Sequence, residues 1–187
     1  MSTLDQARAA IDRALAEGER VILALEGGAA SGKTTLAAAL ASLYQAPVIH
    51  MDEFFLPPDM RTPERFAQPG GNIHSERFQA QTADPIRRNQ SFSYEIFDCS
   101  AGAMAGKKQI GYEKLIIVEG VYSLHPLYRD IYTLRFFLKT DAETQDARLR
   151  ARGEWLYERF QQAWLPMERA YFQAFQPEKC CDLILET

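Results

Sequence analysis

Short apolar runs alternate along the chain with longer segments in which apolar residues recur every three or four positions. The runs are shorter than a membrane span and are typical of parallel strands buried on both faces. They predict strands at residues 21–25, 47–51, 115–118, 134–138 and 183–185. Helical spacing predicts helices at residues 4–15, 33–44, 75–89 and 142–152, with two more apolar helices before the last strand. This alternation predicts an α/β fold with one parallel sheet covered by helices on both sides.

Prolines and glycines indicate where the predicted helices and strands are interrupted or bent. Residues 52–74 are rich in proline and contain two adjacent glycines, which predicts a long loop. Pro85 is expected to bend its helix because proline lacks a backbone N–H, whereas Pro166 suits the first position of the final helix. Residues 92–97 and 109–112 predict short accessory strands.

A glycine-rich segment follows the first predicted strand. Its sequence, Gly-Gly-Ala-Ala-Ser-Gly-Lys-Thr, matches the spacing G-x-x-x-x-G-K-[ST] of a phosphate-binding loop. The two fixed glycines let backbone N–H groups approach a phosphate, and the dipole of the following helix attracts the anion. The expected nucleotide-binding residues are Gly27, Gly28, Ala29, Ala30, Ser31, Gly32, Lys33, Thr34 and Thr35. The alternative is a glycine-rich turn that only caps a helix.

Two acidic residues, Asp52 and Glu119, follow predicted strands. The carboxyl ends of parallel strands share one edge of a sheet, so both side chains are expected near the loop. There, Lys33 is expected to reach the β- and γ-phosphates and Thr34 to ligate Mg²⁺. A phosphotransferase also needs a carboxylate that orients the acceptor hydroxyl, which suits Asp52, and one that holds the metal or its waters, which suits Glu119.

These acidic residues also have plainer interpretations. Asp52 fits a helix cap or a turn, and Glu119 fits a turn before Gly120. Glu53 is expected to be a loop carboxylate or an ion-pair partner, and His50 a histidine satisfied within the core. Only proximity to the loop distinguishes the two interpretations.

The predicted helix at residues 142–152 carries three arginines. Arg148 and Arg152 are four residues apart and share a face, whereas Arg150 is placed to pair with Asp146. Rigid guanidinium groups stabilise the charge that develops on a transferred phosphoryl group, so Arg148 and Arg152 are candidate catalytic residues. The alternative is an ordinary solvated face.

The composition narrows the class of protein. A length of 187 residues predicts a single domain, residues 1–187, and a net charge of −4 argues against nucleic acid as the main partner. The start of the chain resembles no secretory signal, and three cysteines make a poor disulfide framework. We therefore expect a cytoplasmic protein with reduced thiols, a small-molecule substrate and no membrane partner; a homo-oligomer stays open.

Five segments form a recognisable combination, at residues 27–35, 51–55, 93–98, 118–122 and 140–144. Together they resemble the uridine kinase family, which belongs to the P-loop nucleoside and small-metabolite kinases. The resemblance implies a three-layer P-loop NTPase sandwich with a five-stranded parallel sheet in the order 2-3-1-4-5. It also implies a small lid near residues 148–160 and an acceptor-binding insertion near residues 53–112.

The same resemblance implies roles for single residues. Asp52 matches the catalytic aspartate, and Arg148 and Arg152 match lid positions. Tyr94 and Asp98 match a segment beside the acceptor pocket. The family's pyrimidine-reading histidine has no counterpart in residues 99–104.

His74 stands where many relatives have an aspartate that binds sugar hydroxyls, and Arg61 is a further candidate for the acceptor pocket. We therefore predict a kinase that uses ATP and Mg²⁺ to phosphorylate a hydroxyl of a nucleoside or a related small metabolite. Alternatives are a kinase for nicotinamide riboside, pantothenate or a sugar acid, or a regulator that binds nucleotide without catalysis.

Overall fold

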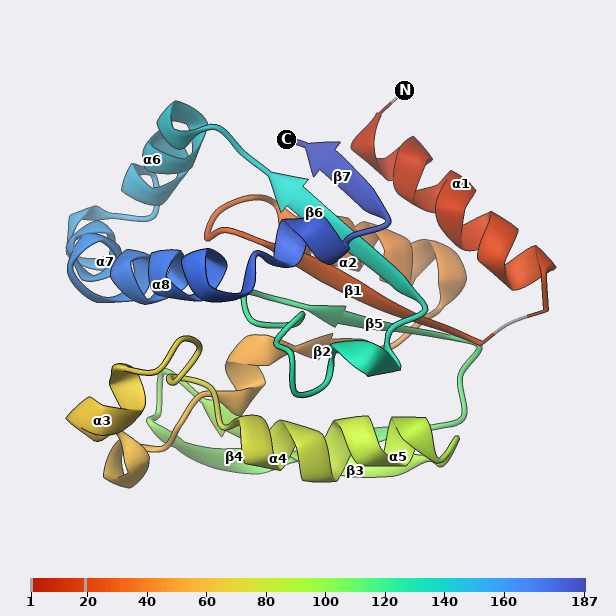
Figure 1. Cartoon of the computed structure of the whole chain (residues 1–187), viewed down its shortest axis with the longest axis horizontal. Helices are drawn as coiled ribbons and strands as arrows, with labels where there is room; N and C mark the ends of the chain where they lie inside the picture. The colour runs from red at the N-terminus through yellow and green to blue at the C-terminus, as the bar shows by residue number, and fades with distance from the viewer. Residues whose placement is uncertain (1, 19) are drawn as a thin grey trace.

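A five-stranded parallel sheet forms the centre of the computed structural model, which describes residues 2–18 and 20–187 (Figure 1). Its strands are β1 (Val21–Gly27), β2 (Val48–His50), β5 (Leu115–Glu119), β6 (Leu134–Lys139) and β7 (Leu183–Glu186). Their spatial order is β2-β5-β1-β6-β7. Two further strands pair only with each other, so this order corresponds to the predicted 2-3-1-4-5 when the strands of the sheet are numbered alone. The predicted parallel sheet is confirmed.

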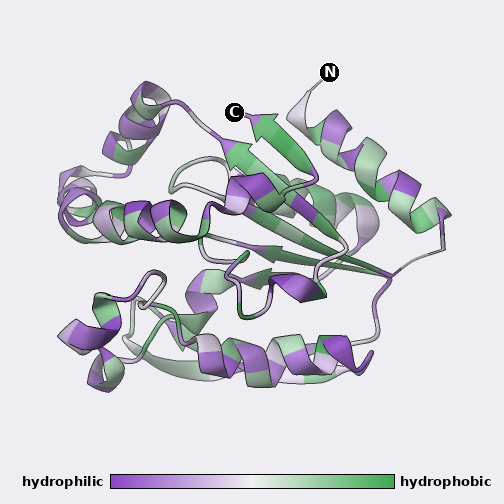
Figure 2. Ribbon diagram, in the orientation of Figure 1, coloured by the Kyte–Doolittle hydropathy of each residue, from purple (hydrophilic) through white to green (hydrophobic). Residues whose placement is uncertain are grey.

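Helices cover both faces of the sheet. On one face, α1 (Thr3–Ala16) and α2 (Lys33–Tyr44) pack Ile11 and Leu40 against Leu23 and Leu25 of β1. On the other face, α8 (Leu165–Phe175) contributes Tyr171 to a second core cluster. Figure 2 shows the apolar strands enclosed by helices of mixed character. The arrangement is the expected three-layer sandwich.

The segment between β2 and β5 corresponds to the predicted insertion. It contains η1 (Met51–Phe54), η2 (Pro58–Met60), α3 (Pro63–Phe66), α4 (Ser75–Phe78), η3 (Gln79–Ala83) and α5 (Asp84–Arg87). The expectation of a plain loop at residues 52–74 is therefore wrong in part, because proline also begins short helical turns. The antiparallel hairpin of β3 (Phe92–Asp98) and β4 (Ala103–Ile110) completes the insertion.

Both interior prolines follow a wider π-helical turn. Pro85 is the second residue of α5 and comes after η3, and Pro166 is the second residue of α8 and comes after η5 (Phe160–Trp164). Proline clashes with the carbonyl four residues earlier, so widening that turn keeps the helix continuous. The expectation that Pro166 begins a separate helix is thus wrong, because α7 (Glu154–Arg159), η5 and α8 are contiguous.

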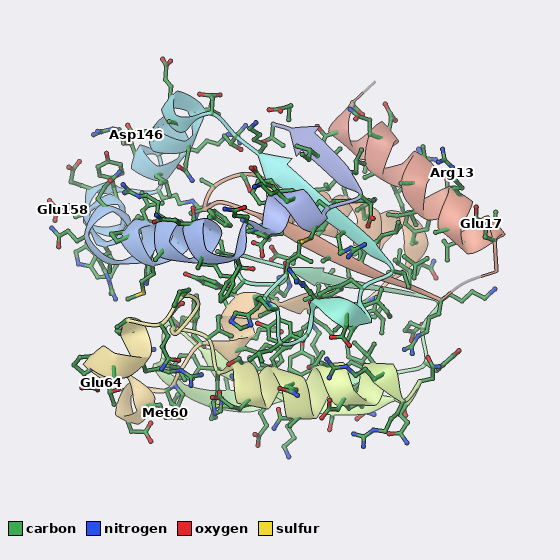
Figure 3. The ribbon with its side chains drawn as sticks, in the orientation of Figure 1. Arg13, Glu17, Met60, Glu64, Asp146 and Glu158 are labelled. Carbon is green, nitrogen blue, oxygen red and sulfur yellow. The ribbon has the colours of Figure 1, made fainter. Side chains whose placement is uncertain are left out.

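The predicted lid, residues 148–160, covers the end of α6 (Ala142–Arg150), all of α7 and the first residue of η5, and these elements lie on the left of the sheet in Figure 1. Figure 3 shows Glu158 on the outer side of α7. The remaining turns are η4 (Arg129–Ile131) and η6 (Pro177–Cys180). Within the described residues, no helix is long and apolar enough to cross a membrane. Cys99, Cys180 and Cys181 are free thiols.

Candidate active site

The glycine-rich loop joins β1 to α2 at the carboxyl edge of the sheet. Gly27 has a φ of 145°, and a Cβ there would lie 2.3 Å from the carbonyl oxygen of Leu138. Gly32 has a φ of 87°, which a side chain also disfavours. Both fixed glycines of the motif are therefore required by the backbone, as the loop prediction needs.

Lys33 is buried inside the curve of the loop. Its Nζ donates to the carbonyl of Gly28 at 2.7 Å and to Oγ of Ser31 at 3.3 Å. Burial lowers the pKa of Lys33, while the carboxylates of Glu26, Glu119 and Glu168 oppose that shift. The described structure thus provides a desolvated ammonium group whose neighbours are mainly acidic.

Thr34 and Glu119, the predicted metal ligands, lie side by side. Oγ1 of Thr34 donates to Oε1 of Glu119 at 3.2 Å, and Nδ1 of His50 lies 2.6 Å from the same oxygen. The hydrogen bond to Glu119 raises the pKa of His50. His50 is therefore satisfied by a hydrogen bond, as expected, but it is partly exposed and contacts the candidate metal ligand instead of lying in the core.

These ligands fit a magnesium ion. No described group of three or more His, Cys, Asp and Glu side chains has a metal-binding arrangement. Mg²⁺ usually takes one or two protein ligands and completes its shell with water and substrate phosphates. The hydroxyl of Thr34 and the carboxylate of Glu119, both beside the phosphate loop, match this coordination preference of Mg²⁺.

Asp52 lies in η1, two residues beyond the point where His50 of β2 pairs with Glu119 of β5. Its side chain is exposed at the same sheet edge as Glu119. Partial desolvation and then the negative charge of Glu119 raise the pKa of Asp52. A raised pKa brings a carboxylate closer to the range in which it can accept a proton from a hydroxyl.

The four predicted acceptor residues each contact other parts of the insertion. Tyr94 is fully buried, and its hydroxyl donates to Oε2 of Glu53 at 2.5 Å. Nδ1 of His74 accepts from the amide of Arg77 at 3.3 Å and caps α4. Glu53 also lies 3.9 Å from Nζ of Lys108, so its predicted role as an ion-pair partner is confirmed.

Asp98 and Arg61 have different surroundings. Oδ1 of Asp98 accepts from the amide and hydroxyl of Ser100 at 2.7 and 2.6 Å, which closes the turn of the hairpin. Arg61 is exposed, and its guanidinium lies 5.7 Å from the ring centre of Phe97. Between them, Sγ of Cys99 donates to the carbonyl of Asp52 at 3.6 Å. Tyr94, His74 and Asp98 thus have structural contacts, whereas Arg61 is exposed, and all four stay predictions for the acceptor pocket.

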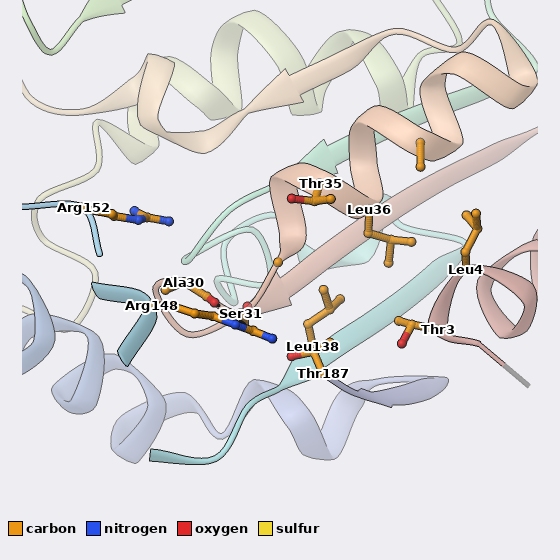
Figure 4. Close-up of a pocket in the computed structure, with 12 residues that line it drawn as sticks. Thr3, Leu4, Ala30, Ser31, Thr35, Leu36, Leu138, Arg148, Arg152 and Thr187 are labelled. Atoms are coloured by element: carbon orange, nitrogen blue, oxygen red, sulfur yellow. Dashed lines mark hydrogen bonds between the residues drawn. The ribbon is translucent and has the colours of Figure 1, made fainter. Parts of the chain in front are cut away.

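A cavity of about 600 Å³ opens on the other side of the loop (Figure 4). Leu4, Leu36 and Thr187 contribute to its wall, and Arg148 and Arg152 border it at the lid end. Nη1 of Arg148 donates to the carbonyl of Ala30 at 3.1 Å, which ties the lid to the loop.

Arg152 follows the end of α6, so the two predicted lid arginines approach the loop without sharing one helix. The guanidinium of Arg152 lies 5.7 Å from the ring centre of Phe160. Arg150 instead pairs with Asp146 at 2.7 Å, as its spacing predicted.

Two buried carboxylates at the loop were missed by the sequence reasoning. Glu26 accepts from the amides of Gly27 and Leu124 at 3.0 and 3.1 Å and from the hydroxyl of Tyr171 at 3.0 Å. Burial raises the pKa of Glu26 to about 7. Glu168 accepts from the amide of Ala29 at 2.8 Å, and burial raises its pKa. The available signal was an acidic residue within an apolar strand or on the apolar face of a helix.

The fold and the loop together define a P-loop kinase fold. The described residues combine a glycine loop, a buried lysine and a sheet edge with two carboxylates. Similar solved structures have the same fold. A possible uridine kinase from Bacillus stearothermophilus is 18% identical, with a TM-score of 0.69 over 96% of this chain and 99% of that one.

Two further structures extend the comparison. YFH7 from Saccharomyces cerevisiae, a candidate P-loop kinase with a circular permutation, is 12% identical, with a TM-score of 0.63 over 100% of this chain and 99% of that one. The TT1252 protein from Thermus thermophilus is 18% identical, with a TM-score of 0.53 over 90% and 89%. No family model matches the chain, and no curated protein sequence matches it. The likeness is therefore one of fold alone.

Proposed function

We propose that this protein is an ATP-dependent kinase that transfers the γ-phosphoryl group to a hydroxyl of a nucleoside or a related small metabolite. One observation carries the proposal: a loop that encloses a buried lysine shares a sheet edge with Asp52 and Glu119. A lysine-centred loop suits phosphate binding, and an exposed carboxylate beside it suits the orientation of an acceptor hydroxyl. A cytoplasmic location is part of the same proposal.

Each group then has a separate task. Lys33 and the loop amides other than that of Ala29, which donates to Glu168, bind the donor phosphates, and the cavity beside Leu36 takes the donor base. Asp52 orients the acceptor hydroxyl and accepts its proton. Thr34 and Glu119 hold Mg²⁺, which supplies positive charge to the phosphates when it is bound.

Arg148 and Arg152 contribute fixed positive charge to the transferred group as the lid excludes water. This role is supported by their position at the lid end of the cavity, within reach of the loop.

Contacts within the insertion favour an acceptor other than uridine. Tyr94 and His74 are engaged by Glu53 and by the amide of Arg77, and Asp98 closes a turn. These contacts support a pocket that reads its acceptor differently from a uridine kinase. A hydroxylated metabolite such as nicotinamide riboside, pantothenate or a sugar acid is therefore the second candidate.

A two-stage screen tests the proposal. A ligand that binds only the folded protein raises its melting temperature by mass action, so nucleosides and hydroxylated metabolites are first screened by thermal shift with ADP and Mg²⁺. Compounds that stabilise the protein are then assayed for ADP formation from ATP. We expect at least one acceptor to be phosphorylated. ATP binding with no turnover across the panel would indicate the non-catalytic regulator, and absence of ATP binding would contradict the nucleotide site itself.

A further inference from the structure

Side chains from two separate helices hold the peptide of Ala29 in the phosphate loop. Oε2 of Glu168 on α8 accepts from the Ala29 amide at 2.8 Å, and Nε2 of Gln145 on α6 donates to its carbonyl at 2.9 Å. Gln145 also donates to Glu168, which helps to keep the buried carboxylate charged. Both hydrogen-bonding groups of one loop residue are thus occupied from outside the loop.

Gly28 has a reason to be glycine that the loop motif does not supply. It occupies a variable position of the motif, and its φ lies outside the left-handed region that Gly27 and Gly32 adopt. A Cβ on Gly28 would lie 2.9 Å from Nε2 of Gln145 and 2.9 Å from Oε1 of Glu168. Glycine at this position therefore gives both side chains room to reach Ala29.

The same two helices connect this contact to the lid. Gln145 lies one turn before Arg148, which donates to the carbonyl of Ala30 at 3.1 Å. Glu168 lies one turn before Tyr171, whose hydroxyl donates to Glu26 at the start of the loop at 3.0 Å. Because α8 continues from α7 and η5 without a break, the helix that carries Glu168 is continuous with the predicted lid.

We propose that Glu168 is a positioning residue that couples the lid to the phosphate loop. The inference rests on the proposed function, because it assigns the coupling to the binding of ATP. Glu168 bonds a loop amide and not the reacting atoms, so it acts through Ala29. ATP that orders the loop also orders α7 and η5, and the hydrogen bond of Glu168 is the link through the continuous helix of α7, η5 and α8, beside the bonds that Gln145 and Arg148 make from α6.

Hydrogen exchange measured with and without ATP and Mg²⁺ tests this coupling. In the wild type, ATP is expected to slow exchange about tenfold both in the loop, residues 27–34, and in the lid, residues 154–164. That factor corresponds to one hydrogen bond to a charged group. In Glu168→Ala, the loop keeps its protection by ATP and the lid loses it. Glu168→Gln recovers most of the lid protection, because an amide oxygen still accepts from Ala29.

Two further variants separate coupling from general destabilisation. Gly28→Ala leaves Glu168 in place and crowds its Oε1 and Nε2 of Gln145, so it is expected to weaken the coupling in part even if Glu168→Ala fails to fold. Glu158→Ala removes an exposed lid carboxylate and is expected to behave as the wild type. Thermal unfolding of each variant without nucleotide gives the purely structural cost.

The outcomes distinguish this inference from the proposed function. If ATP protects the lid equally in the wild type, Glu168→Ala and Gly28→Ala, the coupling is overturned while the nucleotide site stands. Protection of the loop alone in the wild type overturns the coupling as well. If ATP protects neither region of the wild type, the nucleotide site fails and the coupling fails with it.

Discussion

On the donor side of the candidate site, three acidic side chains surround one buried lysine, whereas on the acceptor side the carboxylate of Asp52 and the guanidinium of Arg61 are both exposed. Here the donor side means the phosphate loop with its contacts, and the acceptor side means η1, η2 and the β3-β4 hairpin. Buried charges need partners in fixed positions, so each donor-side residue is constrained by several others. Exposed charges are screened by water and can be exchanged at small cost to folding.

This difference separates stability from chemistry. A substitution on the donor side is expected to change both folding and nucleotide binding, because the same groups serve both. At Asp52, the carboxylate contributes little to packing, so its loss is expected to change chemistry alone. Substitutions on the acceptor side can then change the specificity for the acceptor while the donor side at the same sheet edge stays unchanged.

The largest effect is expected for Asp52→Asn. If Asp52 accepts the proton of the acceptor hydroxyl, the loss of its basicity lowers turnover about a hundredfold or more. The affinity for ATP stays within about twofold, since a single exposed contact is worth little. Steady-state kinetics with an acceptor from the screen and calorimetry with ATP measure the two quantities. Asp59→Asn, at an exposed position of η2, is the matched control. Unchanged turnover would remove Asp52 from the mechanism.

Lys33→Ala is expected to lower ATP affinity roughly ten- to a hundredfold, since it removes charged hydrogen bonds to the donor phosphates. It also leaves Glu26, Glu119 and Glu168 without their nearby cation, so the melting temperature falls as well. Calorimetry and thermal unfolding measure these changes, with Lys107→Ala at an exposed position of β4 as the control. Normal ATP affinity in Lys33→Ala would contradict the phosphate-loop assignment.

Glu26 predicts a pH dependence of folding on the donor side. Its pKa is about 7 in the folded protein against a reference of 4.5, so the folded state binds its proton more tightly than the unfolded state. The stabilisation is therefore complete below the reference pKa and is lost as the pH rises through about 7. Between pH 5 and 7 the loss amounts to about 2 kcal/mol.

Glu26→Gln isolates this contribution from other titrating groups. An amide does not titrate in this range, although its single oxygen can replace only one of the two carboxylate oxygens that accept from the amides of Gly27 and Leu124, so the variant carries a constant cost at every pH. The difference in unfolding free energy between wild type and variant, measured by denaturant titration at several pH values, is expected to shift against the wild type as the pH rises. A constant difference from pH 5 to 7.5 would show that Glu26 does not titrate as described.

The sheet and the loop were predictable because their signals are local. Strands buried on both faces are continuous apolar runs, and the loop requires glycine at fixed spacing. Glu26, Gln145 and Glu168 were not predictable in the same way. Glu168 acts on Ala29, 139 residues earlier in the chain, and no local pattern records that proximity. The position of Glu168 on the apolar face of its helix, three residues before Tyr171, indicates only that its carboxylate needs a hydrogen-bond or ion-pair partner.

The acceptor side depended on another kind of signal. Tyr94, His74 and Asp98 were assigned from a resemblance, and a resemblance transfers positions without transferring contacts. Tyr94 alternates with exposed neighbours on β3 and points inward, where Glu53 accepts its hydroxyl. Asp98 accepts a hydrogen bond that closes the hairpin turn, and His74 caps the N-terminus of α4. The local roles of these side chains became visible only with the backbone.

Tyr94→Phe gives the smallest expected effect and sharpens the comparison most directly. The hydroxyl donates to Glu53 inside the protein, so its removal leaves that carboxylate one partner short and lowers the unfolding free energy by about 1–2 kcal/mol. Tyr112→Phe, on an exposed ring, is expected to change the unfolding free energy by less than about 0.5 kcal/mol. If Tyr94 acts only through folding, the KM for the acceptor stays the same in both variants. A tenfold rise of that KM with unchanged stability would instead make Tyr94 an acceptor-binding residue and give the acceptor side a buried anchor of its own.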